Sequence, residues 1–268
     1  MQSTMQNVPL TVAEILRYAV SVHGDRMVTT ATGDGFRHAT YAAAGQQAAR
    51  LANALRRLGI DGDQRVATFM WNNQEHLEAY VAVPSMGAVL HTLNIRLFPE
   101  QIEFVAYEAE DQIVIADVSL IPILAPVLPR METVHTVIAV GDGDISALEA
   151  SGKTVLRYHD ITAAESDHFE WPDVDENSAA AMCYTSGTTG HPKGVVYGHR
   201  SSYLHSMAVC SGNGMGLSFA DKALAIVPMF HANAWGLPYA ALMAGADLVL
   251  PDRFMDAKSM VNLIETQR

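Results

Sequence analysis

Hydrophobic and polar positions along the chain alternate between a period of two and a period of three to four residues. Short runs rich in β-branched residues recur, and amphipathic stretches follow them. In the first part of the chain the pattern predicts strands at 65–71, 88–93, 113–117 and 135–140, and helices at 12–20, 41–58, 75–86 and 99–109. Such alternation favours an α/β fold with layered parallel or mixed sheets and flanking helices, because parallel strands need crossover connections.

A change in composition divides the chain. Residues 165–177 are acidic, include Pro172 and contain few aliphatic side chains, which predicts a linker. After it the pattern predicts strands at 179–185, 193–197, 223–227 and 247–250, and helices at 200–210, 237–244 and 256–268. We therefore expect a first lobe at 1–170 and the start of a second at 178–268. A last helix without a returning strand favours a partial domain, and a genuine C-terminal helix is the alternative.

Composition excludes some classes of protein. The chain has 268 residues, of which 49% are hydrophobic, and this is enough for a packed core. It carries 17 Lys and Arg against 29 Asp and Glu, a net charge of −12 that would repel a polyanion. Nucleic acid is therefore not an expected partner.

The cysteines and the N-terminus bear on cellular location. Cys183 and Cys210 lack metal-binding spacing, so neither a disulfide scaffold nor a zinc site is favoured, and a cytoplasmic location is predicted. The N-terminus lacks an export signal, and Thr11 with Glu14 indicates a capping box instead. The longest apolar stretch, 120–129, is interrupted by two prolines and is about half the length of a membrane span. Membrane contact is expected to be peripheral at most.

The densest chemical signal is the segment 184–194, Tyr-Thr-Ser-Gly-Thr-Thr-Gly-His-Pro-Lys-Gly, between two predicted strands. Glycines let backbone N–H groups approach an anion, hydroxyls add donors, and a lysine adds a movable positive charge. A polar surface turn has a similar composition. The spacing does not fit a P-loop NTPase, because Lys193 follows Gly190 by three residues and is itself followed by Gly194.

This segment resembles the signature of the adenylate-forming superfamily, which includes acyl-CoA synthetases, luciferases and peptide-synthetase adenylation domains. The resemblance extends along the whole chain and includes 194–200. It implies the incomplete large N-terminal domain of such an enzyme, most similar to fatty acyl-CoA synthetases. The signature positions are filled in register by Met182, Thr185, Ser186, Gly187, Thr188, Thr189, Gly190, Pro192 and Lys193.

The resemblance also implies a reaction. A carboxylate attacks the α-phosphorus of ATP, pyrophosphate leaves, and coenzyme A then takes the acyl group. The loop would hold the β- and γ-phosphates with Thr185, Ser186, Gly187, Thr188, Thr189, Gly190 and Lys193. Thr185 would supply a hydroxyl ligand to Mg²⁺, and Lys193 would act electrostatically and not as a base.

A second segment, 228–236, reads Pro-Met-Phe-His-Ala-Asn-Ala-Trp-Gly and directly follows a predicted strand. Ligands collect at the carboxyl ends of strands in open α/β sheets, although composition alone favours core packing and a structural histidine. In the family the matching segment borders the acid pocket. The resemblance therefore assigns His231 a catalytic and substrate-binding role, Asn233 a substrate-binding role, and Trp235 the mouth of an acyl tunnel, from which its indole would swing when ATP binds.

Other positions give weaker signals. Asn94, Arg96 and Leu97 with 99–102 match a segment common in acyl-CoA synthetases, but a helix N-terminus beside a packed loop explains them equally well, and no catalytic role is assigned. Cys183 is predicted to be a packing group, and His199 to lie near the loop without a defined contact.

Several later motifs of the family have no match here: the Tyr-Gly-x-Thr-Glu segment, the ribose-binding Asp, the hinge and the catalytic Lys of a C-terminal domain. A truncated chain with little or no ligase activity alone is expected. Three hypotheses remain open. The first is part of a medium- or long-chain fatty acyl-CoA synthetase, the second an enzyme that activates an aryl or other acid, and the third a non-catalytic fragment that binds nucleotide or acyl groups or forms a homodimer.

Overall fold

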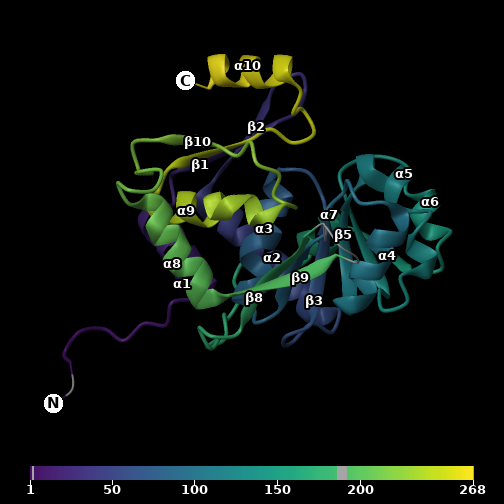
Figure 1. Cartoon of the computed structure of the whole chain (residues 1–268), viewed down its shortest axis with the longest axis horizontal. Coiled ribbons are helices and arrows are strands. Elements are labelled where there is room, and N and C mark those ends of the chain that lie inside the picture. The colour runs from purple at the N-terminus through teal and green to yellow at the C-terminus, as the bar shows by residue number, and fades with distance from the viewer. Residues whose placement is uncertain (2, 186–191, 268) are drawn as a thin grey trace.

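The computed structural model describes residues 1, 3–185 and 192–267. Within these residues the strands form two sheets, and helices fill the space between and around them (Figure 1). The seven-stranded sheet has the order β7-β6-β5-β3-β4-β8-β9, and the four-stranded sheet has the order β10-β11-β1-β2. The α/β class with layered, mixed sheets is thus confirmed.

The seven-stranded sheet is parallel except at one edge, where β9 runs antiparallel to β8. Its strands are β3 (Arg65–Phe69), β4 (Val89–Thr92), β5 (Asp111–Asp117), β6 (Thr136–Val140), β7 (Thr154–Arg157), β8 (Ala179–Thr185) and β9 (Lys193–Gly198). In the smaller sheet β11 pairs in parallel with β10 and β1, and β2 is antiparallel to β1. Its strands are β1 (Met27–Ala31), β2 (Phe36–Thr40), β10 (Lys222–Leu224) and β11 (Asp247–Leu250).

The longer helices are α1 (Val12–Val22), α2 (Tyr41–Arg57), α3 (Gln74–Ser85), α4 (Pro99–Glu108), α8 (His199–Cys210), α9 (Leu237–Ala244) and α10 (Ala257–Thr266). Helices α1, α2, α3 and α10 begin at side chains that cap their first N–H groups. Thr11, Thr40, Asn73 and Asp256 each accept hydrogen bonds from the following turn. Shorter ones are α5 (Ile121–Leu124), α6 (Ser146–Glu149), α7 (Tyr158–Ala163), η1 (Val118–Leu120), η2 (Leu128–Arg130) and η3 (Ala232–Gly236). No helix of the described residues is long and apolar enough to cross a bilayer.

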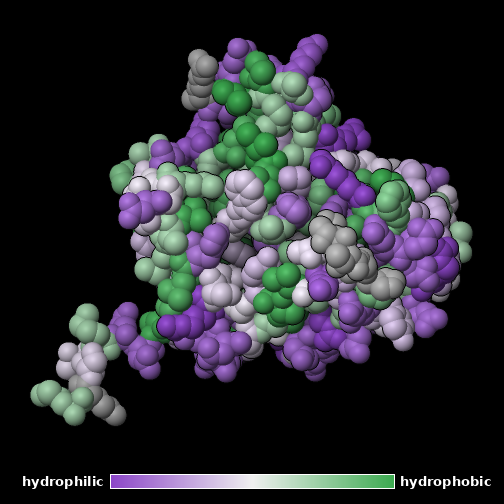
Figure 2. Space-filling model, viewed as in Figure 1, coloured by the Kyte–Doolittle hydropathy of each residue, from purple (hydrophilic) through white to green (hydrophobic). Residues whose placement is uncertain are grey.

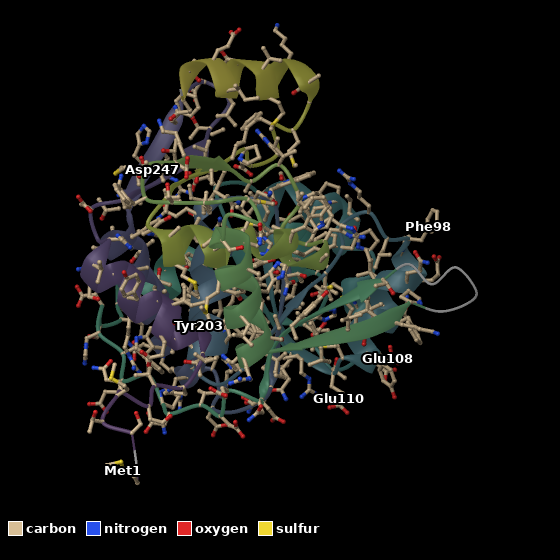
Figure 3. The ribbon with its side chains drawn as sticks, turned by 60° about the vertical axis from the view of Figure 1, so that its left-hand side comes forward. Met1, Phe98, Glu108, Glu110, Tyr203 and Asp247 are labelled. Carbon is tan, nitrogen blue, oxygen red and sulfur yellow. The ribbon has the colours of Figure 1, made fainter. Side chains whose placement is uncertain are left out.

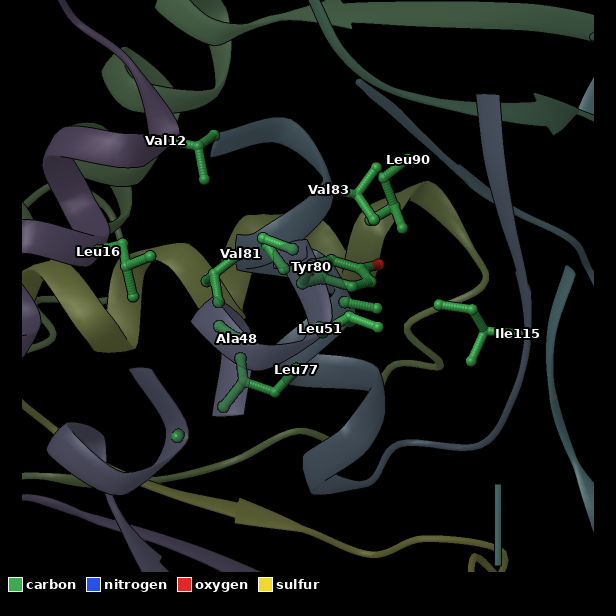
Figure 4. Close-up of a cluster of buried hydrophobic side chains, with 14 of the residues drawn as sticks. Val12, Leu16, Ala48, Leu51, Leu77, Tyr80, Val81, Val83, Leu90 and Ile115 are labelled. Atoms are coloured by element: carbon green, nitrogen blue, oxygen red, sulfur yellow. The ribbon is translucent and has the colours of Figure 1, made fainter. Parts of the chain in front are cut away.

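One continuous core joins the two sheets. Every residue of α3 except Glu75 is buried, because this helix packs between sheet strands and neighbouring helices. Figure 4 shows part of this core, to which several helices and strands contribute side chains. Its labelled side chains include Val12 and Leu16 of α1, Ala48 and Leu51 of α2, Leu77 and Tyr80 of α3, Leu90 of β4 and Ile115 of β5. A second cluster covers the other face of the large sheet beneath α4 and α5.

Some sequence predictions need correction. The strand predicted at 223–227 ends at Leu224, because the next carbonyl groups bond to the side chain of Asn72 instead of to a strand. Strands β1, β2 and β7 were not predicted. Each sheet draws strands from both 1–170 and 178–268, so the predicted lobes do not coincide with the two sheets. The predicted linker at 165–177 is irregular as expected, but Phe169 in it is buried in the core.

Candidate functional site

The β8–β9 hairpin carries the two ends of the predicted phosphate loop. Thr185 pairs with Lys193 and Cys183 pairs with Val195, so strand alternation places these four side chains and Tyr197 on one face. In Figure 3, Glu108 is seen beside this hairpin, and Tyr203 of α8 is seen at the end of the hairpin away from the loop. The predicted loop residues Ser186, Gly187, Thr188, Thr189 and Gly190 lie outside the described part of the chain.

Thr185 and Lys193 are exposed side by side at the loop end of the hairpin. The Thr185 hydroxyl donates to the carbonyl of Lys193 at 3.4 Å, a long hydrogen bond that a ligand can replace. Mg²⁺ held by phosphate oxygens takes few protein ligands, so a single accessible hydroxyl next to a lysine fits such a site. The structure therefore places these two predicted residues together.

The opposite face of the hairpin is held by Tyr184. Its ring lies 5.2 Å from that of His91 and covers Gly194, where a Cβ atom would lie only 3.1 Å from the tyrosine Cζ. His91 is in turn bonded through Nδ1 to Asp111 at 2.8 Å, and both residues are fully buried. Burial raises the pKa of Asp111, although the neighbouring His91 opposes the shift. Gly194 thus leaves room for the ring of Tyr184, which a larger residue would have to displace slightly.

The predicted acid-pocket segment contains a left-handed turn, η3. Ala232, Asn233, Ala234 and Trp235 have φ values of 44°, 49°, 51° and 56°, and Gly236 follows at 70°. A non-glycine residue in a left-handed helical turn costs about 1–2 kcal/mol. Surrounding contacts must therefore maintain this conformation, and backbone strain of this kind often marks functional sites.

Three contacts anchor the turn. The Thr92 hydroxyl on β4 donates to Oδ1 of Asn233 at 3.3 Å, and the backbone of Ala232 lies beside the Cys183 sulfur on β8. From α8, His205 Nε2 lies 2.8 Å from the carbonyl oxygen of Trp235. The turn is thus tied to the large sheet and to α8 together.

Asn72 fixes the chain immediately before the turn. It is fully buried, and its Nδ2 donates to the carbonyls of Ala225 and Val227 at 2.8 and 2.9 Å. Its Oδ1 accepts from the N–H of Met229 at 2.7 Å, and the Tyr80 hydroxyl donates to the carbonyl of Met229. The segment that leads to His231 is therefore held by α3 and by the residue Asn72 that precedes it, rather than by a strand partner.

A cavity of about 390 Å³ opens between α8, α9 and the turn. Its lining residues are Tyr197, Ser201, Ser202, His205, Ala232, Asn233, Trp235, Gly236 and Tyr239.

Three hydroxyl groups of the cavity wall donate their hydrogens to backbone carbonyls of the protein. Ser201 and Ser202 both donate to the carbonyl of Gly198, at 2.8 and 3.0 Å, and Tyr239 donates to the carbonyl of Tyr80 at 2.9 Å. The wall consequently presents mainly carbon, which suits an apolar group.

The predicted acid-pocket residues separate into two kinds. Asn233 is buried and Trp235 is 56% exposed, and both line the cavity. His231 is exposed, its backbone N–H donates to the carbonyl of Pro228, and it lies outside the described cavity lining. Phe230, the residue before His231, is buried, and the guanidinium carbon of Arg96 lies 5.8 Å from the centre of its ring. The 94–102 segment, which gave a weak sequence signal, therefore packs against the 228–236 segment.

The sequence analysis missed the cavity residues of β9, α8 and α9. Ser201, Ser202 and His205 recur at helical spacing on one face of α8, and this pattern was a usable signal. Tyr197 and Tyr239 gave no such sequence signal, because aromatic residues in a predicted strand and helix are ordinary core residues.

His199 does not lie at the phosphate loop. It is fully buried, and its Nδ1 accepts the N–H of Val12 at 3.2 Å, at the start of α1. Burial lowers the pKa of His199 to about 4. The sequence predicts His199 near the loop without a defined contact, and the structure gives it a structural role at the start of α1 instead.

The fold is that of an α/β protein in which an antiparallel hairpin carries the ends of the predicted phosphate loop and a left-handed turn follows at 232–236. The AMP-binding enzyme family matches residues 16–268, and the chain belongs to that family.

Curated relatives agree with the family. The chain is 39% identical, over all of its length, to a 3-methylmercaptopropionyl-CoA ligase of Ruegeria pomeroyi, and covers 50% of that protein. It is 40% identical, again over all of its length, to a medium-chain-fatty-acid–CoA ligase of Ectopseudomonas oleovorans, and covers 49% of it. The chain thus spans about half the length of these relatives.

A solved structure supports the fold. The crystal structure of a long-chain-fatty-acid–CoA ligase from Archaeoglobus fulgidus aligns with a TM-score of 0.84 at 21% identity, over 98% of this chain and 51% of that one. At this identity the likeness concerns the fold.

Proposed function

We propose that this chain supplies the ATP-phosphate site and part of the acid pocket of an AMP-forming acid–CoA ligase. A carboxylate oxygen attacks the α-phosphorus of ATP, the bond to the bridging oxygen breaks, and pyrophosphate leaves. The thiol of coenzyme A then attacks the acyl carbon, loses its proton, and AMP leaves. The observation that carries the proposal is the shared face of the hairpin, which runs from Thr185 and Lys193 to Tyr197 in the cavity wall.

The phosphate residues have distinct proposed roles. Backbone N–H groups and hydroxyls of Thr185, Ser186, Gly187, Thr188, Thr189 and Gly190 bind the β- and γ-phosphates. The exposed ammonium of Lys193 offsets charge that develops on the leaving pyrophosphate. Thr185 supplies a ligand to Mg²⁺, whose charge would neutralise phosphate oxygens when it is bound.

For the acid we propose a medium- or long-chain fatty acid, with its apolar tail in the carbon-lined cavity. His231 lies near the carboxylate, Asn233 forms part of the wall, and Trp235 covers the mouth and moves when ATP binds. Two curated relatives act, by their names, on a thioether acid and on medium-chain fatty acids. The inward hydroxyls of Ser201, Ser202 and Tyr239 favour such acids over polar ones.

Calorimetric titration of the chain with Mg·ATP tests the phosphate site. Binding should weaken at least tenfold in Lys193→Ala, whereas the matched control Lys258→Ala removes an exposed lysine on α10 and should bind as the native chain does. Equal affinity of the two variants would contradict the proposal. ATP–pyrophosphate exchange by the chain alone is expected to be slight, and turnover comparable to that of a complete ligase would refute that expectation.

Binding of acids by the Mg·ATP-saturated chain distinguishes the substrate classes. Octanoate should bind more tightly than benzoate or an amino acid. A preference for benzoate would support an aryl-acid enzyme, and binding of neither acid would leave a nucleotide-binding fragment. The cytoplasmic location, peripheral membrane contact and homodimer stay predictions.

A further inference from the structure

A buried amide group lies at the wall of the otherwise carbon-rich cavity. Asn233 is 7% exposed and belongs to the residues that line the cavity between α8, α9 and the turn. Its Oδ1 accepts the hydrogen bond from the Thr92 hydroxyl of β4 at 3.3 Å. The Nδ2 group can donate two hydrogen bonds and has no partner among the described residues. Because the nitrogen is not sealed off by protein atoms either, it remains reachable from the cavity.

The other polar side chains of the wall do not need a ligand. Three hydroxyl groups donate to backbone carbonyls, as described above, and the hydroxyl of Tyr197 lies 3.7 Å from the Cys183 sulfur. His205 is bonded through Nε2 to the carbonyl of Trp235 and is exposed, so water can satisfy its other nitrogen. Asn233 is therefore the buried lining residue that keeps an unpaired donor within the described part of the chain. A buried donor without a partner costs free energy that a bound acceptor would recover.

The turn fixes the place of this amide relative to the rest of the predicted acid pocket. Asn233 has a φ of 49°, a conformation that asparagine tolerates better than most residues do. His231, two residues earlier, is exposed and lies outside the described cavity lining. An acid with its carboxylate near His231 therefore presents its chain, and not its carboxylate, to the amide of Asn233.

We propose that Asn233 determines specificity by donating a hydrogen bond from Nδ2 to an acceptor atom within the chain of the acid. Among acids of medium length, the preferred substrate then carries an oxygen in its chain, as an ether or a ketone, instead of an unbroken alkyl chain. A thioether sulfur is a weaker acceptor and gives a smaller preference. This inference rests on the proposed function, because it needs an acid bound in the cavity. In this role Asn233 contacts no reacting atom.

The test is calorimetric titration of the chain, in saturating Mg·ATP, with octanoate and with 3-, 4-, 5- and 6-oxaoctanoate, which scan an ether oxygen along the chain. Asn233→Gly removes the amide, and glycine adopts the left-handed backbone without strain. Asn233→Asp keeps an oxygen that can accept from Thr92 and replaces the donor with an acceptor. The matched controls are Asn213→Gly and Asn213→Asp, at an exposed position outside the cavity lining. Far-UV circular dichroism confirms that each variant is folded.

The measured quantity is the Kd of octanoate divided by the Kd of each oxaoctanoate. In the native chain and in both Asn213 variants, one position of the oxygen should give a ratio about tenfold higher than the other positions, the size expected of one hydrogen bond. Both Asn233 variants should lose this maximum. If the amide only supports the fold, or binds the carboxylate, the variants change the affinity for all acids alike and the ratios stay as in the native chain, which overturns the inference.

The failure of this inference is distinguishable from that of the proposed function. A native chain that binds octanoate but favours no position of the oxygen overturns the role of Asn233 and leaves the proposed acid cavity intact. A native chain that binds none of the five acids overturns the acid cavity and the specificity of Asn233 with it.

Discussion

The side chain of Asn72 and the backbone of Met229 are joined by a 2.7 Å hydrogen bond across the junction of the two sheets. The same amide also donates to the carbonyls of Ala225 and Val227. No regular strand covers 225–229, so a single side chain provides hydrogen bonds that a neighbouring strand would otherwise make. The position of the left-handed turn therefore depends on a residue more than 150 positions away, in the segment between β3 and α3.

Asn72→Ala should lower the free energy of unfolding by about 3 kcal/mol. It leaves buried N–H and carbonyl groups without partners, and each costs about 1–3 kcal/mol. Urea unfolding measures the loss. The control is Asn53→Ala, whose amide donates to the carbonyls of Ser166 and His168 at solvent-accessible positions. Water can replace those bonds, so a loss below about 1 kcal/mol is expected, and equal losses would contradict the role given to Asn72.

A buried carboxyl group should make stability depend on pH. Glu78 lies inside α3, where Gln74 donates to one oxygen at 2.7 Å and the Tyr158 hydroxyl to the other at 2.6 Å. Burial, with a smaller contribution from Glu75, raises its pKa from 4.5 to about 8. The folded state therefore holds a proton that the unfolded state releases, so this contribution is complete below pH 4.5 and is lost as pH rises towards 8.

Glu78→Gln isolates this effect, because the histidines titrate equally in both proteins. The unfolding free energy of the native chain minus that of Glu78→Gln should fall between pH 5 and 8, with a slope approaching about 1.4 kcal/mol per pH unit. Urea unfolding at several pH values measures it. Glu103→Gln, which removes an exposed partner of Arg130, should show no such trend. A difference that is constant over this range would rule out a protonated Glu78.

Gly236 meets two constraints that can be separated by mutation. Its φ is +70°, and an added Cβ would lie 2.5 Å from Cδ2 of His205. Gly216 has a φ of +66° with nothing within 4 Å of the added Cβ. Gly216→Ala should thus cost only the backbone term of about 1–2 kcal/mol, and Gly236→Ala should cost more in urea unfolding.

Adding His205→Ala tests the cause of that extra cost. If the imidazole produces it, Gly236→Ala should be less destabilising in the His205→Ala background than in the native one. Equal costs for Gly236→Ala and Gly216→Ala would show instead that the turn adjusts without resistance.

His199 should stabilise α1 in its neutral form. His199→Ala leaves the Val12 N–H without its acceptor, so that amide should exchange faster and the unfolding free energy should fall by about 1–2 kcal/mol. The pKa of about 4 lies below the ordinary 6.5, so the contribution is present above pH 6.5 and is lost as pH falls towards 4. Hydrogen exchange measures Val12, and His38→Ala, at an exposed position, should leave it unchanged. Unchanged exchange in His199→Ala would contradict the capping role.

The sequence predicted the large sheet well because its signals are local. Strands β3 to β6 are continuous apolar runs, and α2 and α4 follow from helical periodicity with Thr40 and Pro99 at their starts. Strands β1, β2 and β7 are not predicted because each is only four or five residues long. For β1, a stabilising partner also lies far away, since it pairs with β11 more than 200 positions along the chain. A short strand gains its stability from such a partner, and sequence periodicity does not reveal it.

Exposed apolar residues show the same limit. Figure 2 shows apolar surface over β9, where Val195 and Val196 are 37% and 58% exposed. From the sequence pattern alone, two valines in a strand are typical of core residues. Their position on an edge strand, and not their hydrophobicity, leaves them uncovered in the part of the chain described here.

The sequence by itself determined the family, because residue types at fixed short spacing specify it, and the phosphate loop stays a prediction from the same residues. The tertiary structure decided the rest of the site. Pairing of Thr185 with Lys193 puts their side chains on the face that carries Tyr197, and packing of the turn on Thr92, Cys183 and His205 creates the cavity. His199 became a structural residue for the same reason. Long-range contacts, which satisfy buried polar groups and hold a left-handed backbone, assign these roles, and no local pattern encodes them.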